Sequence, residues 1–103
     1  MAKLKVFWTN TAIKQRNHIF EYWNSRNKSS LYSKKLNESI KERTDLLKSN
    51  PDLGKKTEFN NTRAISLGHY SILYQRTINK IIITGFWDNR QSPQKLLRFL
   101  LEN

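Results

Sequence analysis

Three closely spaced runs of β-branched and aromatic residues place the strongest constraint on how this chain can fold. The runs cover residues 62–67, 69–76 and 80–86, and this composition favours β-strands. Gly68 alone separates the first two runs, and Thr77-Ile78-Asn79 separates the last two. Connections this short allow only hairpins between strands. The second half of the chain is therefore predicted to form an antiparallel meander.

The last of these runs contains Ile81-Ile82-Ile83, which has no polar side. A strand that is apolar on both sides is typical of the interior of a covered sheet. The sequence predicts a central strand here, with both faces covered.

The first half of the chain has the pattern of a short strand followed by a helix. Residues 3–8 alternate in character, which predicts a strand. Thr9-Asn10-Thr11 supplies the side chains that cap a helix N-terminus. The apolar residues of that helix share one face at a period of 3.6: Ala12, Ile19, Phe20 and Trp23.

A second helix is predicted after the polar segment 24–30, in which Ser29 or Ser30 can act as its cap. Its apolar residues repeat at multiples of about four: Tyr32, Leu36, Ile40 and Leu47. Asn50-Pro51-Asp52 ends it, because proline cannot continue a helix.

A terminal helix is predicted from Ser92-Pro93 onward, with these apolar residues: Leu96, Leu97, Phe99, Leu100 and Leu101.

The resulting order is β-α-α-β-β-β-α in one domain that spans residues 1–103. Helices and strands that are segregated along a chain indicate an α+β fold. We expect the N-terminal strand and the helical hairpin to pack on the antiparallel meander.

The formal net charge of +11 is extreme for a chain of 103 residues, and it predicts an anionic partner such as a nucleic acid or an acidic protein. The chain has no cysteine and two histidines, which excludes disulfides, thiolate nucleophiles and histidine-rich metal sites. No cofactor or metal is expected. No apolar stretch predicts a signal peptide or a membrane-spanning helix, so a cytoplasmic protein without a membrane partner is expected.

The basic residues that are best placed to meet a ligand lie on and beside the predicted sheet. They are Lys55, Lys56, Arg63, Arg76 and Arg90. Arginine on a strand can bind a phosphate through two parallel hydrogen bonds. The alternative for Arg63 is a structural ion pair to a nearby carboxylate such as Glu58, and the alternative for Arg90 is a simple surface charge.

Rings in the same region could stack on nucleobases. His69 adjoins a turn glycine, and Tyr70 and Tyr74 share one face of the predicted strand. The alternative for the two tyrosines is core packing, and for His69 it is a surface position. No nucleophile–base pattern, phosphate loop or zinc spacing is visible, so an enzyme would have to use Arg, Lys, His or Tyr on a phosphate ester.

Four short segments carry a resemblance to a known family. They are Val6-Phe7-Trp8-Thr9 followed by Ala12 and Ile19, Asn50-Pro51-Asp52-Leu53-Gly54-Lys55, residues 62–74 and residues 81–93. In this order and spacing the chain resembles toxins of the RelE/ParE superfamily, the poison half of type II toxin–antitoxin modules. Residues 51–55 and Asn89-Arg90-Gln91-Ser92-Pro93 are most similar to the ParE branch.

The resemblance implies two different activities. RelE-like members cut messenger RNA in the ribosomal A site, whereas ParE-like members inhibit DNA gyrase. A nuclease would use Arg63, Arg90 and His69 as catalytic residues, but the C-terminal tyrosine or histidine of the ribonucleases is missing, and Trp87 stands where ParE-like chains often place histidine. Gyrase inhibition is the first hypothesis, a ribosome-dependent endoribonuclease the alternative, and an inactive basic nucleic-acid-binding domain the third.

Residues predicted to contact nucleic acid or another target are Lys55, Lys56, Arg63, Arg76, Trp87 and Arg90. The resemblance also implies an acidic cognate antitoxin that folds on binding. A toxin–antitoxin hetero-oligomer is therefore expected, with gyrase or the ribosome and its message as the cellular target.

Overall fold

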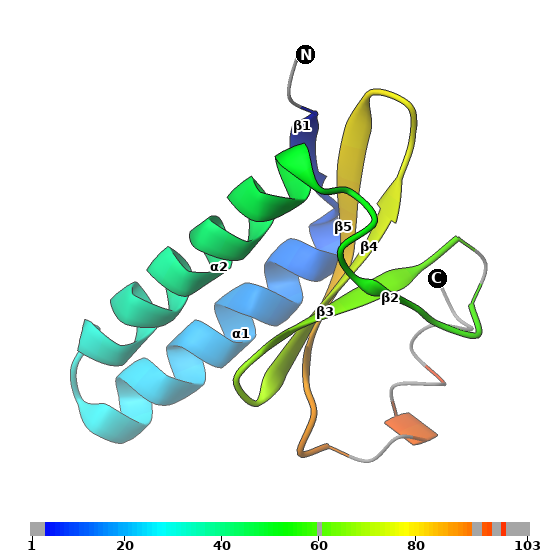
Figure 1. Ribbon diagram of the computed structural model, residues 1–103. Coiled ribbons are helices and arrows are strands. Elements are labelled where there is room, and N and C mark those ends of the chain that lie inside the picture. The colour runs from blue at the N-terminus through cyan, green and yellow to red at the C-terminus, as the bar shows by residue number, and fades with distance from the viewer. Residues whose placement is uncertain (1–3, 60, 92–93, 96–97, 99–103) are drawn as a thin grey trace.

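Two antiparallel helices lie against one face of a five-stranded sheet in the computed structural model (Figure 1). The structure describes residues 4–59, 61–91, 94, 95 and 98. Its elements are β1 Lys5–Trp8, α1 Asn10–Asn27, α2 Leu31–Ser49, β2 Lys55–Lys56, β3 Arg63–Leu67, β4 Tyr70–Arg76 and β5 Lys80–Asp88. The predicted α+β class and the strand–helix–helix–strands order are confirmed. The predicted terminal helix falls largely on residues 92, 93, 96, 97 and 99–101, which lie outside the described residues.

The strand order in the sheet is β1-β5-β4-β3-β2. The hairpins β3–β4 and β4–β5 are antiparallel, as predicted, and β1 joins the far side of β5 in parallel. The two-residue strand β2 pairs with the start of β3. Neither the parallel pairing nor β2 was predicted, because two residues give no periodic signal and a parallel neighbour leaves no local turn to recognise.

The helix ends agree with the capping residues but not with the polar segment 24–30. Thr9 caps α1, and its hydroxyl accepts a hydrogen bond of 3.2 Å from the Ala12 amide. The helix was expected to break at Asn24, yet it runs to Asn27 and ends where Lys28 takes a left-handed conformation with φ of 52°. Polar side chains on a solvent-facing turn do not stop a helix, so the backbone at Lys28 sets the end.

The core lies between the helices and the near face of β3, β4 and β5. The buried stripe of α2 consists of Ser33, Leu36, Ile40, Thr44 and Leu47. The opposing strand residues include Ile72, Tyr74, Ile81, Ile83 and Phe86. Tyr32, which the pattern placed on the apolar stripe, is 38% exposed and packs against Trp23 instead.

A β-bulge in β5 decides which of its residues face the helices. Leu73 pairs with Gly85 and Tyr74 pairs with Ile83, so Thr84 is the extra residue. One extra residue resets the alternation of a strand. The backbone N–H of Phe86, next to the bulge, donates a hydrogen bond of 2.9 Å to the Gln15 side chain of α1.

The isoleucine run is fully buried on one side and partly buried on the other. Ile81 and Ile83 have no exposed surface, whereas Ile82 is half-buried on the other face of the sheet. β5 is an internal strand, as expected, but the prediction that both faces of this run are covered was wrong for Ile82. The reason is that both described helices lie on the same face of the sheet (Figure 1).

Candidate functional site

The loop between α2 and β2 is held against the sheet by the hydroxyl of Tyr74. This hydroxyl accepts a hydrogen bond of 2.8 Å from the Gly54 amide and donates one of 2.9 Å to the Pro51 carbonyl. Tyr74 has no exposed surface, and Tyr70 is 2% exposed. Of the two alternatives for these tyrosines, the structure supports core packing.

Arg63, at the start of β3, binds the same loop through its guanidinium group. Its Nη1 donates to the Asp52 carbonyl at 3.2 Å and to the Gly54 carbonyl at 2.8 Å. Its Nη2 lies 3.6 Å from the Asp52 carboxylate. The carboxylate paired with Arg63 is thus Asp52, and the expected candidate Glu58 is not its partner. Glu58 is exposed on the loop after β2.

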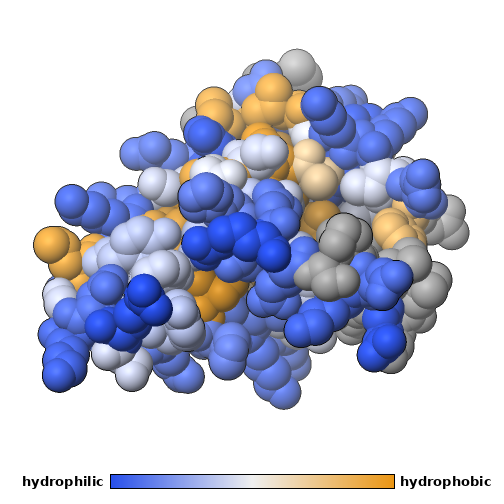
Figure 2. All heavy atoms as spheres, turned by 90° about the horizontal axis from the view of Figure 1, so that it is seen from below, coloured by the Kyte–Doolittle hydropathy of each residue, from blue (hydrophilic) through white to orange (hydrophobic). Residues whose placement is uncertain are grey.

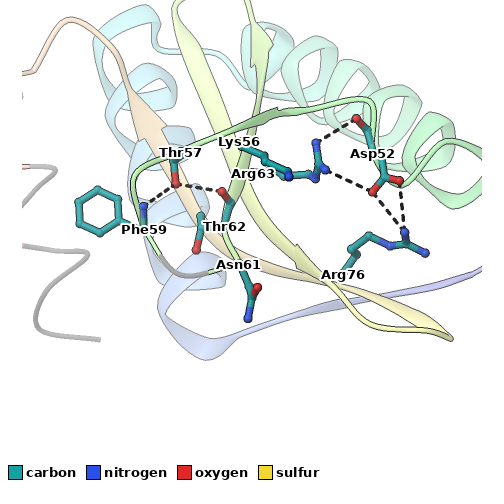
Figure 3. A pocket seen from close by; sticks show the side chains of 8 residues that line it. All are labelled: Asp52, Lys56, Thr57, Phe59, Asn61, Thr62, Arg63 and Arg76. Atoms are coloured by element: carbon teal, nitrogen blue, oxygen red, sulfur yellow. Dashed lines mark hydrogen bonds and ion pairs between the residues drawn. The ribbon is translucent and has the colours of Figure 1, made fainter.

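Arg76 reaches Asp52 from the end of the neighbouring strand β4. Its Nη1 lies 3.2 Å and 3.3 Å from the two carboxylate oxygens. Figure 3 shows Arg63 and Arg76 both pointing toward Asp52. One carboxylate therefore holds two arginines that belong to adjacent strands.

These groups border a hollow of about 270 Å³ at this end of the sheet (Figure 3). We call it the Asp52 hollow. Its lining residues are Asp52, Lys56, Thr57, Phe59, Asn61, Thr62, Arg63 and Arg76. Three of them are cations and one is an anion, and the exposed Lys55 adjoins them on β2. The structure thus brings four of the predicted target-binding residues together.

Arg90 lies at the other end of the sheet, just after β5. Its Nε and Nη2 bind the two oxygens of Asp88 at 2.9 Å and 2.8 Å, and its backbone N–H donates to the same carboxylate at 2.9 Å. These hydrogen bonds hold the pKa of Asp88 below its usual range. The Arg90 guanidinium also lies 5.9 Å from the ring centres of Trp23 and Tyr70, close enough for cation–π attraction.

The two other predicted residues lie at the Arg90 end of the sheet. His69 is exposed in the β3–β4 turn, and its carbonyl accepts a hydrogen bond of 2.7 Å from the Asn89 amide. Trp87 is half-buried near the end of β5, where it borders a second hollow with Lys14 and His18.

The predicted catalytic set is divided between the two ends of β4. Arg63 pairs with Tyr74 near one end, whereas His69 precedes Tyr70 at the other. A strand rises about 3.4 Å per residue, so the five residues from His69 to Tyr74 span about 17 Å. Arg63 therefore does not share one reaction centre with His69 and Arg90.

Comparison with known proteins identifies the family. The family model described as "ParE toxin of type II toxin-antitoxin system, parDE" matches residues 6–93. The chain belongs to the ParE toxin family. The predicted RelE/ParE resemblance and its ParE branch are thereby confirmed.

A solved structure supports the ParE fold independently. It is described as "Chromosomal ParDE TA system from P. aeruginosa", and its chain is 18% identical to this one with a TM-score of 0.71. The match covers 84% of this chain and 96% of that chain. At this identity the likeness shows the fold alone. No curated protein sequence matches the chain significantly.

Sequence reasoning missed Asp52 as a site residue of this ParE-type toxin. Asp52 stands inside the Pro51-Asp52-Leu53-Gly54-Lys55 segment, which indicated the branch of the family but not a contact. A carboxylate so close in sequence to several basic residues could have indicated an ion pair, because neighbouring opposite charges attract. The hydrogen bond of 2.9 Å from Trp23 to the Tyr70 hydroxyl was also missed, because it joins residues far apart in the chain.

The described residues of this ParE-family chain were also compared with the requirements of a metal site and of a membrane span. Within the described residues, no three histidine, aspartate or glutamate side chains gather closely enough to hold a metal ion. Among the same residues, no helix has both the length and the apolar character needed to cross a membrane.

Tyr70 makes the stability of the toxin depend on pH in the alkaline range. Burial, with a smaller contribution from Tyr32, raises the pKa of Tyr70 to about 12. The unfolded chain releases this proton near pH 10, so the free energy of unfolding is unaffected below about pH 10 and falls between about pH 10 and 12. We expect a loss of about 2 kcal/mol across this range.

Urea unfolding at pH 9 and pH 11.5 measures the effect, with Tyr70→Phe as the control. The variant is less stable at pH 9, because Trp23 loses its acceptor, but its stability should fall less between the two pH values. All other side chains are the same in both proteins, so the difference between them reports on Tyr70 together with its contact to Tyr32. An equal fall in both would contradict the assignment.

Proposed function

We propose that this ParE-type toxin inhibits DNA gyrase in the cytoplasm and is neutralised by a cognate antitoxin. The observation that carries the proposal is the ParE family match over residues 6–93. Resemblance to ParE-like toxins implies inhibition of gyrase. The arrangement of the site supports the same conclusion against a nuclease.

A ribonuclease needs a proton-transfer group beside the cations that stabilise its phosphate. In this toxin Arg63 and His69 lie at opposite ends of β4. Arg90, at the His69 end of the sheet, is bound to both carboxylate oxygens of Asp88. These observations favour action through protein contact over cleavage of messenger RNA.

The antitoxin is proposed to be acidic. The chain carries a net charge of +11, and hydrophilic side chains cover most of the face seen in Figure 2, with small apolar patches between them. An acidic, partly disordered segment fits such a surface, with a helix along the α1–α2 hairpin. Charge complementarity should make the association rate fall as salt rises.

A supercoiling assay with purified gyrase tests the target. We expect the isolated toxin to block supercoiling, and we expect stoichiometric addition of the antitoxin encoded beside it to restore the activity. Lys41→Gln, on the exposed face of α2, serves as a control that removes one charge away from both hollows and should inhibit like the wild type.

Primer extension on cellular messages after brief induction tests the alternative. Under the proposal the message pattern stays unchanged while growth stops. New codon-phased 5′ ends together with unaffected supercoiling would replace gyrase inhibition with the ribonuclease activity.

A further inference from the structure

The Asp52 hollow has the composition of an anion-binding site whose ligand position is filled by the protein itself. We propose that it binds a phosphodiester of a nucleic acid strand, and that the Asp52 carboxylate occupies the phosphate position until the strand displaces it. This goes beyond gyrase inhibition, because direct binding to nucleic acid can be measured with no gyrase present.

Arg63 is held in place without help from the Asp52 carboxylate. Its Nη1 is engaged by the Asp52 and Gly54 carbonyls at 3.2 Å and 2.8 Å. Those backbone contacts remain when the carboxylate moves away. The guanidinium is therefore fixed in advance, which reduces the entropy lost when an anion binds.

The carboxylate itself binds Arg63 poorly. Its nearest approach to Arg63 Nη2 is 3.6 Å, which is longer than a hydrogen bond. The two non-bridging oxygens of a phosphodiester match the planar donors of arginine, which can bind them through two parallel hydrogen bonds. The second amine of Arg63 thus has bonding capacity that Asp52 leaves unused.

The contact between Asp52 and Arg76 is open to solvent. The Asp52 side chain is 59% exposed and the Arg76 side chain is 39% exposed. Exposed ion pairs contribute little to stability, so an incoming phosphate can replace this one at small cost. Asp52 lies in the turn that begins at Pro51, where it is exposed to solvent.

The rest of the lining favours a nucleic acid strand over an acidic protein segment. Lys56 is exposed and forms no ion pair with the described carboxylates. The half-buried Phe59 lies on the opposite side of the hollow from Asp52 (Figure 3). Cations that track a backbone, together with a ring on which a base can stack, form the usual combination for binding single strands.

Fluorescence anisotropy with labelled single-stranded twelve-nucleotide DNA and RNA of one sequence tests the proposal. We expect Asp52→Asn to bind both about fivefold more tightly than the wild type, because the internal competitor is gone. Asp45→Asn is the matched control, since it causes the same change in charge on α2, where Asp45 pairs with Lys48 at 3.1 Å. Its affinity should change less than twofold, in line with a remote exposed charge.

A second pair of variants keeps the test decisive if Asp52→Asn folds poorly. Arg76→Gln should weaken binding and reduce the slope of log affinity against log salt by about 1, as expected for one lost phosphate contact. Lys41→Gln removes an equal charge from α2 and should leave the slope nearly unchanged. Thermal melting of each variant confirms that the folded protein is being measured.

The outcomes divide as follows. Equal binding of DNA and RNA supports a site that reads the phosphodiester, and preference for one of them supports the proposal and identifies the strand it takes. Equal tightening by Asp52→Asn and Asp45→Asn would overturn it, because net charge alone would explain the result. Binding of a polyglutamate peptide, but of neither oligonucleotide, would overturn it in favour of an acidic protein partner.

Discussion

Replacing Gly54 by alanine should lower the free energy of unfolding by about 3 kcal/mol, near the upper end for overpacking a filled site. An added Cβ would lie 2.7 Å from both Cε1 and the hydroxyl of Tyr74, and 3.0 Å from the Ala64 carbonyl. Tyr74 has no exposed surface and cannot retreat. The loop must move instead, which breaks the bond between the Gly54 amide and the Tyr74 hydroxyl.

Urea denaturation at neutral pH measures this loss, and Gly68 provides the control. Gly68 has φ of +59°, with open space around its Cβ position. Gly68→Asn should change the free energy of unfolding by about 1 kcal/mol or less, because asparagine tolerates this conformation. Similar losses for Gly54→Ala and Gly68→Asn would show that Tyr74 does not limit the space at Gly54.

Arg63→Ala should lower the free energy of unfolding by about 2–3 kcal/mol and reduce growth arrest. The guanidinium makes two charge-assisted hydrogen bonds to the carbonyls of the 52–54 loop, and bonds to charged groups are worth about 1.5–3 kcal/mol each before the loop relaxes. The sequence alone predicted either binding of a phosphate or another target by Arg63, or a structural ion pair that stabilises the protein. The observed contacts make Arg63 a structural residue at the edge of a candidate site.

Two companion variants separate structure from function at Arg63. Arg63→Lys keeps the charge but cannot reach both carbonyls in the same way, so it should recover only part of the stability. Glu58→Gln should match the wild type in melting temperature, because Glu58 is exposed and is not the ion-pair partner of Arg63. Full stability with lost growth arrest in Arg63→Ala would assign Arg63 to target contact alone.

Local patterns predicted most elements of the fold because each element carries its own signal. Thr9 marks the start of α1, Pro51 follows the end of α2, and the short gap at Gly68 forces the β3–β4 hairpin. The end of α1 was placed too early because its polar last turn resembles a loop. The bulge at Thr84 could not be predicted, since it depends on how β5 packs against both β4 and α1.

The sequence predicted which basic residues belong to the candidate site, but it did not predict how they are arranged around Asp52. Basic residues next to predicted strands were enough to select Lys56, Arg63 and Arg76. The pairing of β3 with β4 brings the two arginines to one carboxylate, and that pairing register is a tertiary property. The same register separates His69 from Arg63, which no spacing along the sequence reveals.

The parallel pairing of β1 with β5 has a consequence for the synthesis of this toxin. Lys5 pairs with Lys80 and Trp8 with Ile83, so β1 has no neighbouring strand until β5 has been made. Contacts this distant in sequence form late and slowly. A ribosome adds about 5–20 residues per second, and the sheet cannot close until β5 has emerged. The sheet of the nascent toxin therefore stays incomplete until β5 has been made, and β1 remains an unpaired strand edge that other chains can contact in the meantime.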